Sequence, residues 1–136
     1  LAADKAIAYL QQVDYPSEYF DAIHHAICAH SYSANIATET LEAQVVQDAD
    51  RLDGLGAVGV SRCMLVAGKL DSKLYHHDDP FCQTRTPNSK LAAVDHFYEK
   101  LFKTAETMKT RAGAQEAERR VQFMLSFLQQ LETEID

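Results

Sequence analysis

The sequence has 136 residues and a formal net charge of −7. This length suits one domain with a single hydrophobic core. The acidic balance argues against nucleic-acid binding through a basic face, and any phosphate site would need a metal ion or a local cluster of cations. No apolar run is long enough to cross a bilayer and no secretory signal is visible, which predicts a protein without a membrane partner.

The cysteines indicate the redox environment. They number three, an odd count, and are scattered along the chain at Cys28, Cys63 and Cys82. This spacing is typical of reduced thiols and not of a disulfide framework or a zinc cluster. The sequence therefore predicts a cytoplasmic protein.

The first half of the chain predicts three helices. Apolar residues at helical spacing favour a helix over 2–12, and Pro16 with Ser17 marks a break. A second helix is expected over 17–29, with His30 continuing its apolar side. A third opens at Glu39 or Thr40 and is apolar on two sides, as in the centre of a bundle. We expect it to continue past three glycines to about residue 70.

The second half predicts a long loop and two further helices. Turn residues over 71–88 indicate a loop of the kind that often covers a binding site. Apolar residues then recur at 3–4 spacing from Leu91 to Met108 and from Ala117 to Ile135, with a short turn from Thr110 to Gly113. No convincing strand is present. The predicted fold is all-α and ends in a long antiparallel helix pair.

The organising stretch of the sequence is 47–62, which places carboxylates, arginines and glycines within an apolar helix. Gly54, Gly56 and Gly59 form a G-x-G-x-x-G string, a dinucleotide fingerprint only when it follows a strand. The residues before it are helix-like and acidic, so close helix packing is the favoured interpretation.

The aspartates of this stretch should have different roles. On an ideal helix Asp48 and Asp50 point about 200° apart, so they should not coordinate the same metal ion. Asp48 lies one turn from Arg51 and on the side of Arg62, which favours an internal ion pair. Asp50 faces the second apolar side without a neighbouring cation, so it is either a buried ligand for a hard metal or a buried, hydrogen-bonded aspartate.

Other candidate groups carry weaker signals. Among His24, His25 and His30, His30 stands out because it extends a core seam, although a hydrogen-bonded core histidine is the commoner outcome. Residues 76–79 spell two histidines and two aspartates but lie in a loop ended by proline, so we expect a mobile, solvated segment. Cys28, in mid-helix among apolar neighbours, is expected to be a small buried hydrophobe.

Several motifs together resemble the HD-domain superfamily of metal-dependent phosphohydrolases, in particular its bacterial YedJ-like branch. The resemblance rests on A-I-C-A-H-S-Y-S at 26–33, V-Q-D-A-D-R-L-D at 46–53 and G-A-V-G-V-S-R at 56–62. Shorter matches are D-P-F at 79–81, D-H-F at 95–97 with K-L at 100–101, and Met108 with Thr110. The chain resembles the C-terminal two-thirds of an HD domain, as one helical domain over 1–136 that is truncated at its N-terminus.

The resemblance implies an activity and roles for five residues. Asp50 would be the last metal ligand of the family's set, and His30 the catalytic residue at the edge of the site. Arg51, Arg62 and Lys100 would bind phosphate. The implied reaction is hydrolysis of phosphoester or phosphoanhydride bonds, with nucleotides as substrates and with water activated by Mn²⁺ or Mg²⁺.

The same comparison raises a second hypothesis. The family's upstream His ligand and adjacent His-Asp ligands have no counterpart in this sequence, because His77-Asp78 follows Asp50 and lies in a loop. A non-catalytic helical binding or dimerisation module is therefore the alternative, and a homo-oligomer stays open. We also expect an exposed apolar surface where the missing helices would lie.

Overall fold

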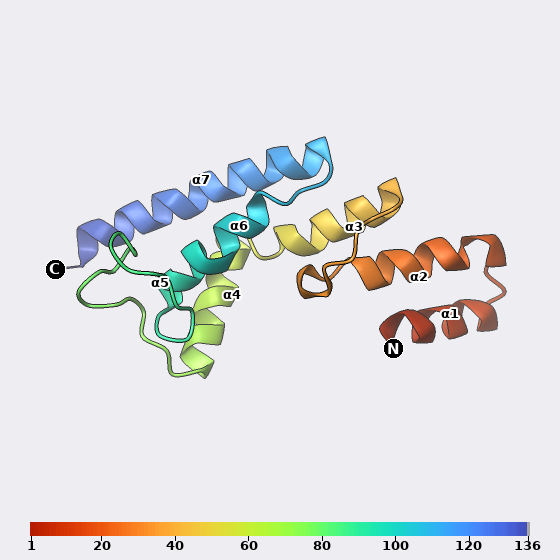
Figure 1. The fold of residues 1–136 in the computed structure, drawn as a ribbon, viewed down its shortest axis with the longest axis horizontal. Helices are drawn as coiled ribbons and strands as arrows, with labels where there is room; N and C mark the ends of the chain where they lie inside the picture. Colours follow the sequence, from red (N-terminus) through yellow and green to blue (C-terminus); the bar gives the residue numbers. More distant parts are fainter. Residues whose placement is uncertain (136) are drawn as a thin grey trace.

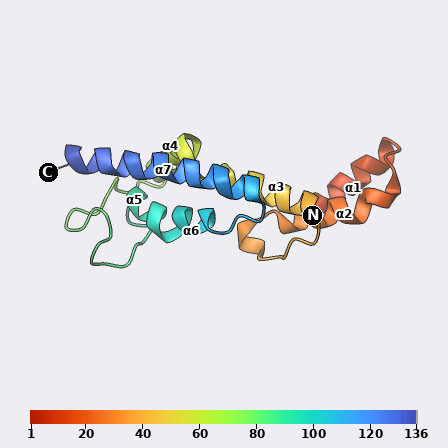
Figure 2. The same ribbon diagram turned by 90° about the horizontal axis from the view of Figure 1, so that it is seen from above.

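The computed structural model describes residues 1–135, and these residues form an all-helical, elongated molecule (Figure 1). The predicted all-α class is confirmed. The N-terminus belongs to a helical hairpin at one end of the molecule, and the C-terminus lies at the opposite end (Figure 2). No helix among residues 1–135 is both long and apolar enough to cross a membrane.

The N-terminal hairpin consists of α1 (Ala2–Gln12), the 3₁₀ turn η1 (Ser17–Tyr19) and α2 (Phe20–Ala29). These bounds match the two helices predicted from the sequence. A further 3₁₀ turn, η2 (Tyr32–Ala34), leads to α3 (Leu41–Leu52). Thr40, one of the two residues expected to open this helix, caps α3, because its hydroxyl accepts a hydrogen bond from the Ala43 amide at 3.1 Å.

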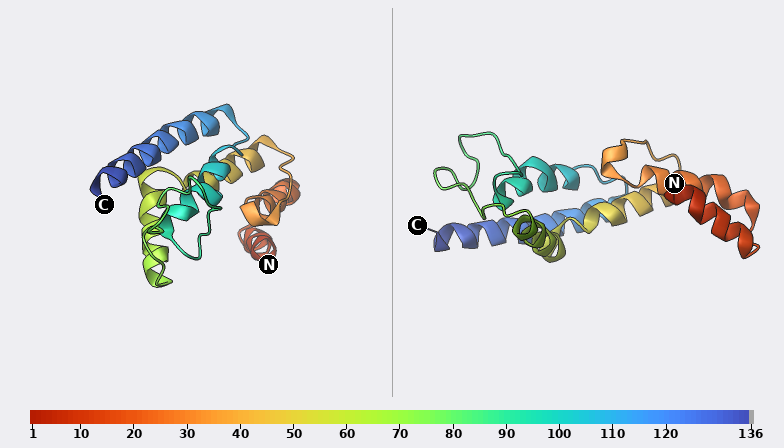
Figure 3. Two further views of the ribbon diagram at one scale, coloured as in Figure 1. Left: turned by 60° about the vertical axis from the view of Figure 1, so that its left-hand side comes forward. Right: turned by 90° about the horizontal axis from the view of Figure 1, so that it is seen from below.

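The expected continuous helix to about residue 70 is wrong. The helix ends at Leu52, and α4 (Gly56–Lys69) starts in a new direction (Figure 3). Turn bonds from the Gly54 and Leu55 amides to the Arg51 and Leu52 carbonyls make the break, and Gly56 adopts a φ of +68° that favours glycine.

The break depends on a close backbone approach. A Cβ at Gly59 would lie 2.2 Å from the Gly54 carbonyl oxygen, so position 59 has no room for a side chain. The prediction that these glycines serve close packing and no dinucleotide fingerprint is therefore confirmed.

The last third contains α5 (Ala93–His96), the π-helical turn η3 (Phe97–Leu101), α6 (Phe102–Ala105) and α7 (Arg111–Glu134). The segment 93–105 and α7 run in opposite directions and contact each other, so the predicted antiparallel pair is confirmed (Figures 1 and 2). Its turn lies earlier than expected, at residues 106–110 instead of 110–113, because Thr110 caps α7 and Arg111 already begins it.

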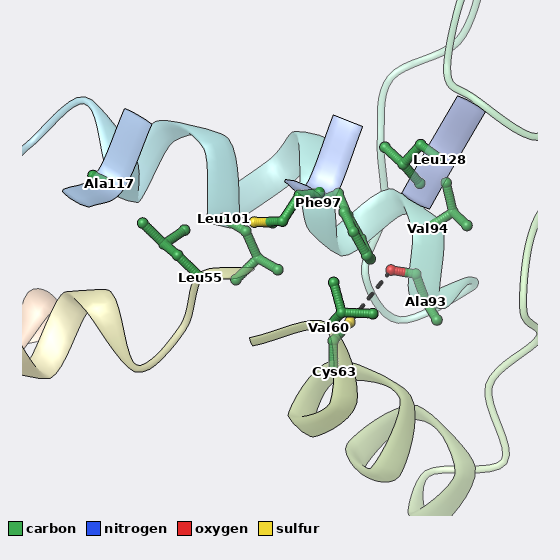
Figure 4. Close-up of a cluster of buried hydrophobic side chains, with 10 residues drawn as sticks. Leu55, Val60, Cys63, Ala93, Val94, Phe97, Leu101, Ala117 and Leu128 are labelled. Atoms are coloured by element: carbon green, nitrogen blue, oxygen red, sulfur yellow. Dashed lines mark hydrogen bonds between the residues drawn. The ribbon is translucent and has the colours of Figure 1, made fainter. Parts of the chain in front are cut away.

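The main core lies between α4, the segment 93–105 and α7 (Figure 4). Its largest fully buried side chains include Phe97, Leu55 and Met124. The Phe97 ring stacks on Phe127 at 6.1 Å and meets the edge of Phe102 at 6.2 Å between ring centroids. The Cys63 thiol is buried in this core and donates to the Ala93 carbonyl at 3.6 Å.

Asp48 is buried but has no ion-pair partner among residues 1–135, so the predicted internal ion pair with Arg51 or Arg62 is wrong. Its carboxylate instead accepts hydrogen bonds from the Lys109 amide at 2.8 Å and from the Thr110 amide and hydroxyl at 2.8 and 2.7 Å. Backbone donors replace the expected cation and satisfy the buried charge.

Large apolar side chains are exposed along one side of α3 and α4, in agreement with the predicted apolar surface. They are Val45, Val46, Val58, Leu65, Val66 and Leu70. The third helix was expected to be apolar on two sides and central in the bundle; it instead exposes Val45 and Val46, whereas Val60 of α4 is buried in the core.

Candidate functional site

A cavity of about 540 Å³ lies where the C-terminal part of α3, α4, the segment 93–105 and the end of the long loop meet. Its floor is formed by small and apolar side chains of α4 and the core. Its polar lining comes from Asp50, Arg51, Arg62, Ser72, Ser89, Lys90, His96, Lys100 and Thr104. The break between α3 and α4 creates this cavity, because it turns α4 away from the line of α3 (Figure 1).

The lining of the cavity is cationic although the chain as a whole is acidic. Two arginines and two lysines face a single carboxylate, that of Asp50, whereas the net charge of the chain is −7. A cluster of cations on a concave surface attracts anions and raises their local concentration. The local charge needed for a phosphate site in an acidic protein is therefore present.

Asp50 lines this cavity but is exposed, so the prediction that it is buried is wrong. The two aspartates do lie on opposite sides of the helix, as expected, but of the two only Asp48 is buried. Asp50 shares the exposed side with Val46. Its carboxylate makes no hydrogen bond with residues 1–135, which leaves both oxygens free to accept a ligand.

The predicted cations differ in how firmly they are held. Arg51 is half-buried, donates to the Thr107 carbonyl at 2.6 Å and has its guanidinium 5.5 Å from the centre of the Tyr32 ring. Arg62 is mostly exposed and contacts Asp53 at 3.3 Å. Lys100 is exposed and forms no ion pair within residues 1–135. Lys100 is thus the most available of the three for an anion.

His30 is not among the residues that line the cavity. It lies half-buried after the end of α2, and its Nδ1 donates to the Ile27 carbonyl at 2.5 Å. The structure therefore brings together Asp50, Arg51, Arg62 and Lys100 but not His30.

Sequence reasoning did not select three residues that the structure adds to the lining: Ser89, Lys90 and His96. Their position depends on the end of the long loop, which is fixed by a buried ion pair. Arg85 donates to both oxygens of Asp95 at 2.5 and 2.6 Å, and the Asn88 amide donates to the same carboxylate at 2.7 Å. The only signal in the sequence was the D-H-F motif, which contains both Asp95 and His96.

The long loop contains hydrogen bonds of its own, and His76 and Asp79 are half-buried, so residues 76–79 are not solvated throughout as expected. Asp79 accepts bonds from the Gln83, Thr84 and Arg85 amides at 2.8 to 3.1 Å. These donors, those of Thr84 and Gln83 first, lower the pKa of Asp79 to about 2. His77 and Asp78 do point to solvent, as predicted.

The metal chemistry of the site is incomplete within the described residues. No group of three or more His, Cys, Asp or Glu side chains in residues 1–135 is arranged to hold a metal ion. One carboxylate, that of Asp50, does not hold a divalent cation tightly. The residues present therefore do not make a metal site by themselves.

Comparisons with known proteins give the chain its relatives, although no family model matches. The sequence is 36% identical over 122 residues to YpgQ, an uncharacterized protein of Bacillus subtilis, and the match covers 87% of this chain and 54% of that protein. The crystal structure of Bacillus subtilis YpgQ in complex with ADP superimposes with a TM-score of 0.76 at 32% identity, over 99% of this chain and 62% of that one.

A second solved relative carries a family name. An HD-superfamily hydrolase from Bacillus thuringiensis gives a TM-score of 0.77 at 32% identity and covers 97% of this chain and 61% of its own. The chain thus spans little more than half the length of its curated relative and less than two thirds of these solved chains. These likenesses, which extend over nearly all of the chain, support an HD-like family for it.

Proposed function

We propose that this chain forms part of a metal-dependent phosphohydrolase that acts on phosphoester or phosphoanhydride bonds of nucleotides. The observation that carries the proposal is the cavity lined by four cations in a chain of net charge −7. Such a cluster suits the charge that accumulates on phosphate oxygens during phosphoryl transfer.

The cations would have different roles, because some are exposed and one is held by neighbouring groups. Lys100 and Arg62, which are exposed, would contact the phosphate oxygens. Arg51, fixed by Thr107 and the Tyr32 ring, would supply a preorganised charge. Lys90 at the end of the long loop joins this set because it lines the same cavity.

Nucleotides are proposed as the substrate class from two likenesses. YpgQ has been crystallised with ADP, and a second relative is an HD-superfamily hydrolase. Within this class, cleavage of nucleoside triphosphates with release of pyrophosphate is the reaction suggested by the YedJ-like resemblance. Membership of that branch, like a cytoplasmic location, stays a prediction.

A divalent cation, Mn²⁺ or Mg²⁺, is part of the proposal, with Asp50 as one of its ligands. The remaining ligands would have to come from outside the described residues, because no cluster within them suffices. His30 as a catalytic residue stays a prediction; it lies outside the cavity lining.

The absence of a metal-ligand cluster in residues 1–135 favours a second candidate function. A non-catalytic helical module would need no metal ligands, and the exposed apolar side chains of α3 and α4 offer a surface for binding or dimerisation. The substrate assay below distinguishes the two, because the module predicts no turnover in any form of the protein.

The test measures phosphate and pyrophosphate release from a nucleotide panel with Mn²⁺ or Mg²⁺. Both the 136-residue chain and any longer product of its gene are assayed. We expect K100M to lower kcat/KM by about 10- to 100-fold, the value of one lost charge-assisted contact. We expect D50N to weaken the dependence of the turnover rate on metal concentration. The control is E42Q, on the exposed side of α3 outside the cavity. Absence of turnover and of nucleotide binding in both proteins would contradict the proposal.

A further inference from the structure

Three polar side chains form a connected hydrogen-bonded chain at the rim of the cavity. His96 Nδ1 lies 3.0 Å from the Ser89 hydroxyl, and that hydroxyl also bonds to the Glu99 carboxylate. The Ser89 amide donates to the same Glu99 oxygen at 2.7 Å. His96 and Ser89 both line the cavity, so one end of this chain meets the space where a substrate would bind.

The direction of these hydrogen bonds fixes the proton on the imidazole. An ionised carboxylate only accepts, so the single hydroxyl proton of Ser89 is given to Glu99. The Ser89 oxygen is then left as an acceptor, and His96 Nδ1 must be the donor. In the neutral ring this places the free electron pair on Nε2.

Nε2 is open to the site. It has no hydrogen-bond partner within residues 1–135, and it is absent from the buried atoms without partners, so it is accessible to solvent. The ring itself is half-buried and lines the cavity. An accessible nitrogen with a free electron pair and a fixed tautomer is the arrangement that a general base requires.

The charges around the ring favour its neutral form. Burial lowers the pKa of His96 below its usual 6.5, and the Lys100 cation lowers it further, whereas Glu99 opposes the shift. From the loop, Ser89 contacts the ring, and Lys90 lines the same cavity. The carboxylate of Asp95, the residue before His96, is paired with Arg85. Across the cavity lie Arg51, Arg62 and Asp50, a net positive set.

The local helix geometry is also unusual at this point. The π-helical turn Phe97–Leu101 follows His96 directly and contains Lys100. Single π turns within α-helices occur frequently at functional sites. Here the turn connects the histidine and the lysine that line one cavity.

We propose that His96 Nε2 is the proton acceptor for the water that attacks phosphorus, and that Ser89 and Glu99 are positioning residues that hold its tautomer. The inference rests on the proposed function. In the step, the water oxygen forms a bond to phosphorus, and the bond from phosphorus to the leaving oxygen breaks with its electron pair on that oxygen. The water proton passes to Nε2, and the imidazolium later returns it to solvent.

The first test reads the tautomer without any turnover. In protein labelled with ¹⁵N-histidine, two-bond ¹H–¹⁵N spectra at neutral pH should show the His96 ring, identified by the loss of its signals in H96Q, protonated on Nδ1 and unprotonated on Nε2. His30 shares this tautomer because its Nδ1 donates to the Ile27 carbonyl, so the assignment rests on the H96Q comparison. S89A should remove the preference for this tautomer. A His96 ring that is protonated on Nε2, or that is charged at neutral pH, would overturn the inference.

The second test is the pH dependence of turnover. We expect kcat to fall tenfold per unit below the His96 pKa, and H96Q to lose about 10²- to 10⁴-fold in kcat together with this acidic limb. The control H77Q changes a solvent-exposed loop histidine and should match the wild type. If the wild type is active and H96Q is equally active, the role of His96 is overturned but the proposed function is not. A wild type without any turnover overturns the proposed function as well, so the two failures are distinguishable.

Discussion

The N-terminal hairpin and the C-terminal helices differ in what they bury. In α1 and α2 the buried side chains are those of Ala3, Ala26 and Ala29, whereas the C-terminal core buries Phe97, Leu55 and Met124. A fully buried Phe, Leu or Met contributes about 1.5–3 kcal/mol, and alanine much less. The stability of the molecule therefore comes mainly from the region that also carries the cavity.

The hairpin is joined to the rest of the molecule by α2 and α3. Ala43 of α3 is fully buried, and Gln47 donates to the Ala29 carbonyl at 2.6 Å. This contact buries small and polar side chains, in contrast to the aromatic cluster of the core. The two regions should consequently respond very differently to equivalent truncations.

The largest expected effect is that of F97A. Removing a fully buried ring that packs on Phe102 and Phe127 should cost about 3–5 kcal/mol of unfolding free energy. The matched change in the hairpin is F20A, at a half-buried position, for which about 1 kcal/mol is expected. Urea unfolding of the two variants measures the difference, and equal losses would refute the asymmetry between the regions.

The next effect concerns the ion pair that joins the long loop to the core. R85A leaves the Asp95 carboxylate buried without its cation and should cost about 3 kcal/mol at neutral pH. Burial raises the pKa of Asp95, but hydrogen bonds from Arg85 and the Asn88 amide outweigh it, so the net pKa is below its usual value.

The sign of this shift predicts a pH dependence. Because the folded pKa is depressed, the carboxylate stabilises the protein above its unfolded pKa of about 3.9, and this stability is lost as the pH falls through the folded value. The difference in unfolding free energy between wild type and R85A should therefore become smaller as the pH falls. A gap that stays constant from pH 7 to pH 3 would show that Asp95 is not the group responsible, and R119A, which breaks an exposed pair, serves as the control.

The smallest expected effects on stability are those of alanine substitutions at two glycines of α4. A Cβ at Gly59 would meet the Gly54 carbonyl oxygen at 2.2 Å, so G59A should lose about 1–3 kcal/mol. A Cβ at Gly68 meets nothing within 4 Å, and G68A should gain about 0.4–1 kcal/mol by restricting the unfolded chain. Thermal unfolding should show opposite signs; losses in both variants would contradict the free space around Gly68.

Periodicity was enough to predict most of the fold. Apolar spacing located the helices, and Thr40 and Pro16 marked boundaries, because caps and breaks depend on neighbouring residues. The break between α3 and α4 was missed although Asp53-Gly54 is a turn signal. The partners of Asp48 could not be foreseen, since its hydrogen-bond donors come from residues 109 and 110.

For the candidate site, too, some residues could be predicted from the sequence and others could not. Asp50, Arg51, Arg62 and Lys100 were named by resemblance and do line one cavity. His96 and Ser89 lie together only because Arg85 and Asp95 fix the loop end. Such a juxtaposition depends on tertiary contacts that no local pattern encodes.

The bonds of Asp48 to the Lys109 and Thr110 amides also set the longitudinal position of α7. Apolar side chains that repeat every three or four residues would tolerate a displacement of the helix by one turn, about 5.4 Å. A carboxylate bonded to the amides of Lys109 and Thr110, directly before the helix, does not tolerate it, because the carboxylate would lose these donors. A single buried aspartate thus selects one alignment of a 24-residue helix from several that hydrophobic packing alone would allow.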